Sequence, residues 1–248
     1  MPNFSSTRAL WLAPLALALA ACSDTGPKAS QPVSLSVTTK PSSSPSADIM
    51  IGSGANSLTI SQAQIVLARI ELSPSGACAT TGEEDDCDEL EVGPTLVSLP
   101  VDGSTQVVLD GVVSPGTYRA LEAKLDAVTA DDDEAGASAF LTAHPDFQGV
   151  SVMVMGAFTD ANSVAHAFTF TSEVDAEIEA MFQPPVTVDA GTSNLTIAVD
   201  VASWFTDATG AAIDPTNAAN AEVINRNIEN SFRAFEDDNR DGGDDHKE

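Results

Sequence analysis

The stretch Asn194-Leu-Thr-Ile-Ala-Val-Asp-Val201 alternates apolar and polar residues without interruption. Successive side chains of a β-strand point to opposite faces, so the four apolar residues would share one face. Strict alternation of this kind indicates a strand with one buried side and one solvated side. We therefore expect this segment to belong to a sheet that packs on a second layer.

Similar segments recur upstream, and turn sequences separate them. Asp102-Gly103 is typical of a hairpin turn, and Ser114-Pro115-Gly116 marks a chain reversal. The segments span 58–72, 95–99, 105–109, 117–128, 151–158 and 164–171. Many short strands with regular turns predict a mainly β fold, an antiparallel β-sandwich of the prealbumin/immunoglobulin-like kind over residues 49–214. We expect Met153 and Met155 to pack against a second layer rather than to bind a ligand.

The period of the pattern changes after residue 214. Asp214-Pro215 is a good helix start. The apolar residues that follow recur at three- and four-residue spacing: Val223, Ile224, Ile228, Phe232 and Phe235. This predicts a C-terminal amphipathic helix over 215–236 that packs on the sandwich, followed by an acidic tail over 237–248. A helix that docks onto a partner protein is the alternative.

The N-terminus indicates export and lipid anchoring. Arg8 precedes a run of mainly alanine and leucine that ends at Leu19-Ala-Ala-Cys22. A charged start and a short apolar run are typical of a signal peptide, here residues 1–21, and the run is too short for a spanning helix of about 20 residues. We predict acylation of Cys22, with an ordinary signal peptide as the alternative. Residues 22–48 would form a Ser/Pro-rich tether, within which we expect a first strand at 33–39.

The chain carries a formal charge of −27. Such a surface repels phosphate backbones, so nucleic acid is excluded as an expected partner. It also favours solubility and attracts divalent cations. Ser23 follows Cys22, and by resemblance to Gram-negative lipoproteins this favours the outer membrane without deciding which membrane face displays the domain.

Cys78 and Cys87 remain if Cys22 is acylated. Outside the cytoplasm we expect them to form a disulfide that pins one polar loop. A loop this short gains less than the roughly 3 kcal/mol of a 15-residue loop. A zinc site is the alternative, but no histidine lies near the two thiols.

The C-terminal tail carries the most specific ligand pattern. Asp237, Asn239, Asp241 and Glu248, with Gly242 for the sharp turn, fit the spacing of a calcium-binding loop. Asp244 departs from the pattern because an apolar residue is usual there, and no exiting helix follows Glu248. Calcium is therefore the one cofactor that the sequence suggests, and a solvated acidic tail is the alternative.

Other polar clusters indicate no reaction. The acidic runs that begin at Glu83 and Asp131 lack ligand spacing and are interpreted as solvated loops. His144, His166 and His246 belong to no metal-ligand motif, and no nucleophile elbow of the Gly-x-Ser-x-Gly type occurs.

Four segments resemble uncharacterised secreted bacterial lipoproteins of the domain of unknown function 4382 group. They are Pro115-Gly-Thr-Tyr118, Phe140-Leu-Thr-Ala-His-Pro-Asp-Phe147, Val199-Asp-Val-Ala-Ser-Trp-Phe205 and Ser231-Phe-Arg-Ala-Phe-Glu-Asp-Asp238. The resemblance covers about residues 58–242. It implies a β-sandwich and export, and it brings no activity or catalytic residue with it.

We therefore predict a non-catalytic lipoprotein of the outer membrane, a binding or structural module with a glycan or protein ligand at the cell surface. The alternative is an extracellular hydrolase that uses acidic residues or a metal ion. An enzyme should show a deep pocket with convergent carboxylates or histidines.

Overall fold

The structure is a computed structural model that describes residues 31–39, 48–75, 90–113, 116–132, 136–188, 193–237, 239 and 241–243. Cys22, Cys78, Cys87, His246 and Glu248 lie outside these described residues. The same holds for the segment 1–21 that we interpret as a signal peptide.

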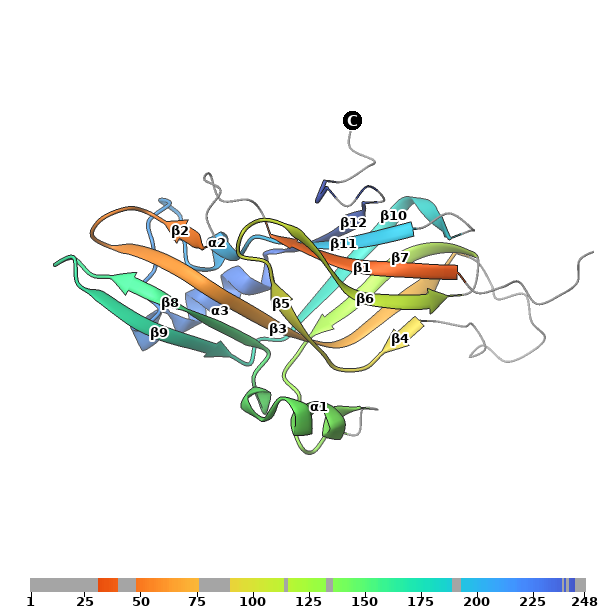
Figure 1. Cartoon of the computed structure of the whole chain (residues 1–248), viewed down its shortest axis with the longest axis horizontal. Helices are drawn as coiled ribbons and strands as arrows, with labels where there is room; N and C mark the ends of the chain where they lie inside the picture. The colour runs from red at the N-terminus through yellow and green to blue at the C-terminus, as the bar shows by residue number, and fades with distance from the viewer. Residues whose placement is uncertain are drawn as a thin grey trace, which may run out of the picture.

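The described residues form two layers of β-sheet (Figure 1). The larger sheet has eight strands, all attached directly or indirectly to β3 (Ser57–Pro74). Along its main path the order is β10 (Ala176–Val188), β7 (Gly116–Leu125), β3, β8 (Val152–Thr159) and β9 (Ala165–Ser172). Three short strands pair with the other edge of β3: β2 (Ile49–Ile51), β5 (Thr95–Leu99) and β4 (Leu90–Val92).

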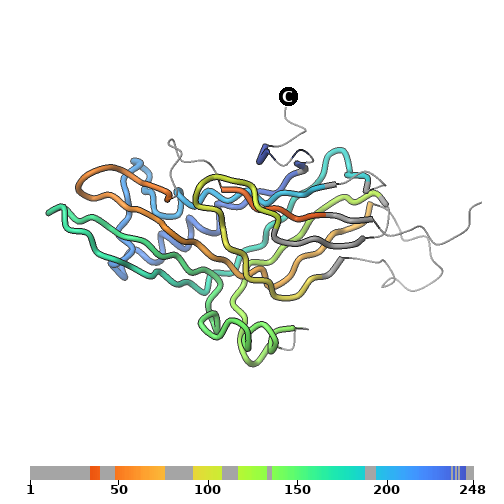
Figure 2. Tube along the Cα trace, in the orientation of Figure 1, coloured from red at the N-terminus to blue at the C-terminus, as the bar shows by residue number. Residues whose placement is uncertain are grey.

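The smaller sheet has the order β12 (Phe232–Glu236), β11 (Ser193–Val199), β1 (Gln31–Thr39) and β6 (Thr105–Val113). β1 pairs with β11 in parallel and with β6 in antiparallel orientation. The beginning and the end of the described chain therefore lie side by side, as the red and blue tubes of Figure 2 show. Residues 31–39 thus belong to the sandwich, in the interior of a sheet, rather than to a tether.

The core lies between the two sheets because alternate residues of each strand face inward. Ile70 and Leu72 of β3 are buried on one face, and Leu195, Ile197 and Val199 of β11 are buried opposite. The mainly β, sandwich-like fold predicted from the sequence is therefore confirmed, including the buried apolar face of the Asn194–Val201 stretch. The expected solvated side is wrong, because Asn194 and Thr196 on the opposite face are fully buried as well.

Short helices close the sandwich. α2 (Val201–Trp204) follows β11 directly, and the Asp200 side chain caps it by accepting a hydrogen bond from the Ser203 backbone N–H. η2 (Ala218–Asn220) and α3 (Ala221–Glu229) come next, and Ile224 and Ile228 of α3 are fully buried. Among the described residues no helix is long and apolar enough to span a bilayer.

The helix predicted over 215–236 is shorter than expected, which corrects the sequence interpretation at both ends. The Asp214 carboxylate accepts hydrogen bonds from the backbone N–H and the hydroxyl of Thr216, which forms a turn rather than a helix cap. Residues 232–236 form β12, which pairs antiparallel with β11. Pairing satisfies the backbone groups along the edge of β11, and this outweighs the helical spacing of Phe232 and Phe235.

A second, smaller core lies on the outer face of the larger sheet. α1 (Ala137–Ala143) and η1 (Pro145–Phe147) bury Phe140 and Phe147 against Val66 and Val128. Met153 packs against the same cluster, in agreement with the packing role expected for it. This small layer divides the outer face of the sheet into two halves (Figure 1).

Candidate binding face

The strand register places glutamates of β3, β7 and β10 in one row, and Glu91 of β4, which lies opposite Glu71, extends it. Glu71 of β3 lies opposite Glu122 of β7, and Glu122 lies opposite Glu179 of β10. Like charges directly opposite each other destabilise a sheet. These side chains point away from the core because Ile70 and Leu72, their neighbours on β3, are buried on the inner face. The row therefore lies on the outer face of the larger sheet.

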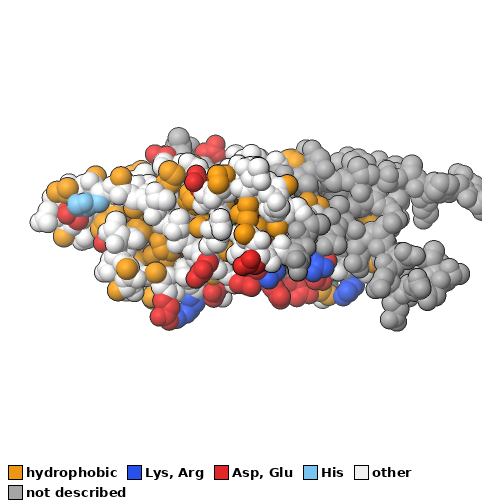
Figure 3. Space-filling model, turned by 90° about the horizontal axis from the view of Figure 1, so that it is seen from below, with side chains coloured by type: hydrophobic (Ala, Val, Ile, Leu, Met, Phe, Trp, Pro, Cys, Tyr) orange, Lys and Arg blue, Asp and Glu red, His pale blue; other side chains and the backbone are white. Residues whose placement is uncertain are grey.

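A second row runs beside the first and carries both signs. Arg69, Lys124 and Glu177 lie opposite one another on the same three strands. Arg69 forms an ion pair with Glu71 along β3. We define the charged face by the side chains of Arg69, Glu71, Glu122, Lys124, Glu177 and Glu179, which together surround a shallow hollow of about 220 Å³. Acidic and basic side chains gather at this part of the surface in Figure 3.

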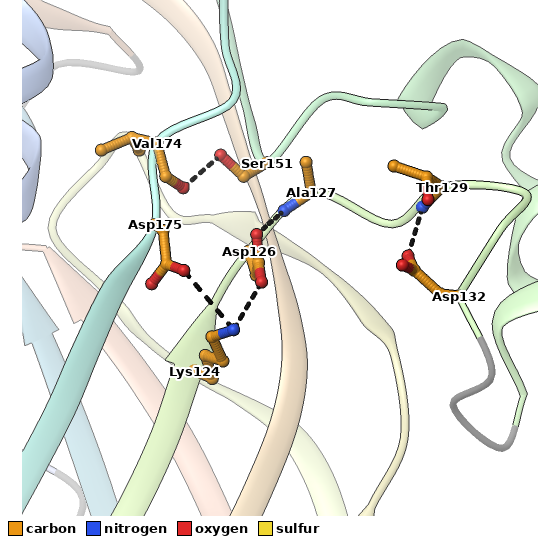
Figure 4. A network of polar contacts seen from close by, with 8 residues as sticks. All are labelled: Lys124, Asp126, Ala127, Thr129, Asp132, Ser151, Val174 and Asp175. Carbon is orange, nitrogen blue, oxygen red and sulfur yellow. Dashed lines mark hydrogen bonds and ion pairs between the residues drawn. The ribbon is translucent and has the colours of Figure 1, made fainter.

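Lys124 is held at one end of the charged face by two further carboxylates. Its Nζ lies 2.6 Å from Asp126 Oδ2 and 3.4 Å from Asp175 Oδ2 (Figure 4). The hydrogen bond to Asp126 raises the pKa of Lys124, and the negative charges of Asp126 and Asp175 act in the same direction. The four glutamates of the charged face, together with Asp126 and Asp175, make six carboxylates around two cations, Arg69 and Lys124. This region of the surface therefore has a net negative charge.

Hydrogen bonds hold the segments that carry these carboxylates. The Asp126 Oδ1 atom accepts a hydrogen bond from the Ala127 backbone N–H at 2.7 Å. The buried Ser151 hydroxyl donates to the Val174 carbonyl at 2.7 Å and so fixes the segment before Asp175 (Figure 4). The six residues that define the charged face all lie on strands, and these hydrogen bonds hold the two carboxylates that follow β7 and precede β10.

We expect Glu122→Gln to stabilise the protein. The change removes one like charge from the row and keeps the oxygen that accepts a hydrogen bond from the Ser73 hydroxyl at 3.2 Å. The gain should be about 0.2–1 kcal/mol at low salt, and it should shrink in about 1 M salt because the Debye length falls to about 3 Å. Urea unfolding at both salt concentrations measures it. Glu173→Gln, at an exposed position between β9 and β10, is the matched control and should change stability less; an equal gain in both variants would contradict the prediction.

The predicted calcium ligands are placed only in part. Asp237 is fully buried, and its carboxylate accepts hydrogen bonds from the Thr196 hydroxyl and from the backbone N–H groups of Asp241 and Gly242. Asn239 is exposed, and its Oδ1 atom also accepts from the Asp241 N–H. The carboxylate thus pins the segment after β12 onto the smaller sheet. Glu248 and Asp244 lie outside the described residues, so calcium binding stays a prediction.

Within the described ranges, no group of three or more His, Cys, Asp and Glu side chains is arranged to hold a metal ion. The two histidines that the structure describes lie in different places. His144 follows α1 and contacts the Phe140 ring, at the side of an open groove of about 540 Å³ between α1 and the β4–β5 connection. His166 of β9 contacts Asp160 at 3.0 Å.

No protein-family model matches the chain, and no curated protein matches it. The resemblance to the domain of unknown function 4382 group therefore stays a prediction. A solved structure, MbnP from Methylosinus trichosporium, aligns with a TM-score of 0.40 at 12% sequence identity, over 76% of this chain and 82% of that chain.

Proposed function

We propose that this protein is a non-catalytic, lipid-anchored binding module of the outer membrane whose charged face binds a basic segment of a partner protein. Acylation of Cys22 provides the anchor in this proposal. The sandwich provides a rigid support for the face, and the partner supplies lysine or arginine side chains that the row of glutamates attracts.

The observation that carries the proposal is the register of Glu71, Glu122 and Glu179. Like charges in line lower the stability of the sheet, and of the two cations in the neighbouring row only Arg69 forms an ion pair with a glutamate of this row, Glu71. Residues that break a local rule without a structural gain are expected at functional sites. A basic partner would convert this repulsion into attraction.

The geometry favours an extended cationic segment over a single metal ion. Neighbouring strands lie about 4.8 Å apart, so the row spans about 10 Å. Calcium instead requires oxygens that converge to about 2.3–2.6 Å from one point. Lysines on one side of an extended peptide recur about every 6.8 Å, so two of them fall within the length of the row. The residues that define the face include no aromatic side chain, which argues against a sugar-stacking surface.

Titration with a synthetic peptide of alternating lysine and serine tests the proposed face. We expect Glu122→Gln with Glu179→Gln to weaken binding about three- to tenfold at low salt, because two exposed charge pairs are lost. The matched control, Asp131→Asn with Glu173→Gln, removes the same net charge at exposed positions outside the face. Equal losses in the two double variants would mean that net charge alone attracts the peptide, and the proposed site would be wrong.

A further inference from the structure

β9 is the last strand of the larger sheet, and one of its edges is open. It pairs with β8 on one side, and no described strand pairs with it on the other (Figure 1). Such an edge presents unpaired N–H and C=O groups that can template another strand. The strand is eight residues long and contains no proline and no lysine, the residues that commonly protect an edge.

The hydrogen bonds at the hairpin end decide which peptide groups face outward. The Asp160 N–H donates to the Val164 carbonyl at 2.9 Å, just beyond the opposed pair Thr159 and Ala165. In an antiparallel ladder this makes Ala165 part of a pair that is not hydrogen-bonded across the strands. The alternation then directs the N–H and C=O groups of four residues toward the open edge: Ala165, Ala167, Thr169 and Thr171.

The outer face of the sheet beside this edge carries neutral side chains, and the Asp160 carboxylate that contacts His166 lies at the hairpin end. The side chains of the four outward-facing residues are all exposed. Their neighbours on the next two strands are also neutral. Ala167 lies opposite Ala157 of β8, which lies opposite Thr59 of β3. Thr169 lies opposite Met155 of β8, which lies opposite Gln62 of β3. In Figure 3 the end of the molecule away from the grey atoms is mainly white and orange. Residues 161–172 contain no Asp, Glu, Lys or Arg in a chain with a net charge of −27.

We propose that β9 pairs antiparallel with β9 of a second copy of this chain, so that the two larger sheets form one continuous sheet across a two-fold axis. The axis passes beside Phe168. This register sets Ala167 opposite Thr169 of the second copy, and Ala165 opposite Thr171 of the second copy. The backbone groups of all four outward-facing residues then form hydrogen bonds between the two copies. It also sets the half-buried Phe168 ring opposite its own counterpart, an aromatic pair that favours association.

The neutral character of the edge favours a second copy of this chain as the strand that pairs with β9. A charged strand from another protein would bring unpaired charges against a neutral edge, whereas this segment is self-complementary in a closed two-fold arrangement. Two chains of charge −27 also repel one another over most of their surface, and the residues that pair in this register, 165–171, contain no carboxylate. A single strand pair buries less than the roughly 1,200 Å² of a standard interface, so we expect a micromolar dissociation constant.

Sedimentation velocity of the purified chain tests the dimer over a range of protein concentrations. Cys22→Ser is included in every variant so that acyl chains cannot drive association. We expect a monomer–dimer equilibrium. Thr169→Pro should raise its dissociation constant about tenfold or more, because the substitution removes one outward hydrogen bond from each of the two copies. The N–H of Thr169 does not bond to β8, so the change leaves the β8–β9 ladder in place. Thr169→Val keeps the N–H and should dimerise like the parent chain.

A second pair of variants keeps every backbone N–H. Ala167→Glu with Thr169→Glu sets carboxylates opposite each other in the dimer and should also dissociate it. The matched Ala167→Gln with Thr169→Gln has the same bulk without charge and should preserve it. A monomer at every concentration up to about 500 μM, far above a micromolar dissociation constant, would overturn the proposal. So would a dimer that neither the proline nor the double glutamate variant weakens.

Discussion

Replacing Trp204 with alanine is expected to lower the free energy of unfolding by about 3–5 kcal/mol, the usual result of truncating a buried aromatic side chain. Trp204 is fully buried at the end of α2. Its Nε1–H donates to the Ser231 hydroxyl at 2.6 Å, and its ring centroid lies 6.4 Å from that of Phe232. The side chain therefore joins α2 to the start of β12. Its loss leaves a cavity and removes one hydrogen bond from the Ser231 hydroxyl, which still donates to the Ile228 carbonyl at 2.7 Å.

Urea unfolding followed by far-ultraviolet circular dichroism measures this loss. Trp204→Phe is the matched control, since it keeps most of the apolar volume and removes the N–H donor. We expect the phenylalanine variant to lose less than half as much stability as the alanine variant. A loss below about 1 kcal/mol in Trp204→Ala, the size of a single hydrogen bond, would contradict the central place of Trp204 in the core.

Replacing Cys22 with alanine is expected to move the protein from the membrane fraction to the soluble fraction. Each buried CH₂ of an acyl chain contributes about 0.8 kcal/mol to membrane binding, and stable anchoring requires more than one chain. A lipoprotein loses all of its chains with this one thiol. Cell fractionation and metabolic labelling with a fatty-acid probe measure the effect.

Cys78→Ala is the control for the labelling, because that thiol is expected to pair with Cys87 rather than to carry lipid. The control should keep both the label and the membrane location. Equal labelling of Cys22→Ala and the parent chain would remove the anchor from the proposed function. It would leave the peptide experiment on the charged face unaffected.

The sandwich could be predicted because its strands alternate cleanly. Leu195, Ile197 and Val199 are buried as the pattern requires, and so are Ile70 and Leu72. The end of the chain could not be predicted as well, because Phe232 and Phe235 stand at a spacing that also suits one face of a helix. The edge of β11 decides between the two, and that edge exists only once the sheet has formed.

The charged face illustrates the same limit. The sequence shows Glu71, Glu122 and Glu179 on separate strands, and the alternation of Glu122 and Lys124 with apolar neighbours predicts a strand with one wet face. Which glutamate lies opposite which depends on register, and a shift of one residue would move a whole strand to the other face. β7 itself pairs irregularly with both neighbours, so no sequence rule fixes the row in advance.

The position of β1 limits how far this protein can reach. Eight residues separate Cys22 from Gln31, where β1 enters the smaller sheet. A fully extended chain of that length covers about 25–30 Å, which is roughly the diameter of a small domain. An acylated Cys22 would therefore keep the sandwich within one domain width of the bilayer. The proteins it could meet are then residents of the membrane and its immediate vicinity, rather than solutes that diffuse at a distance.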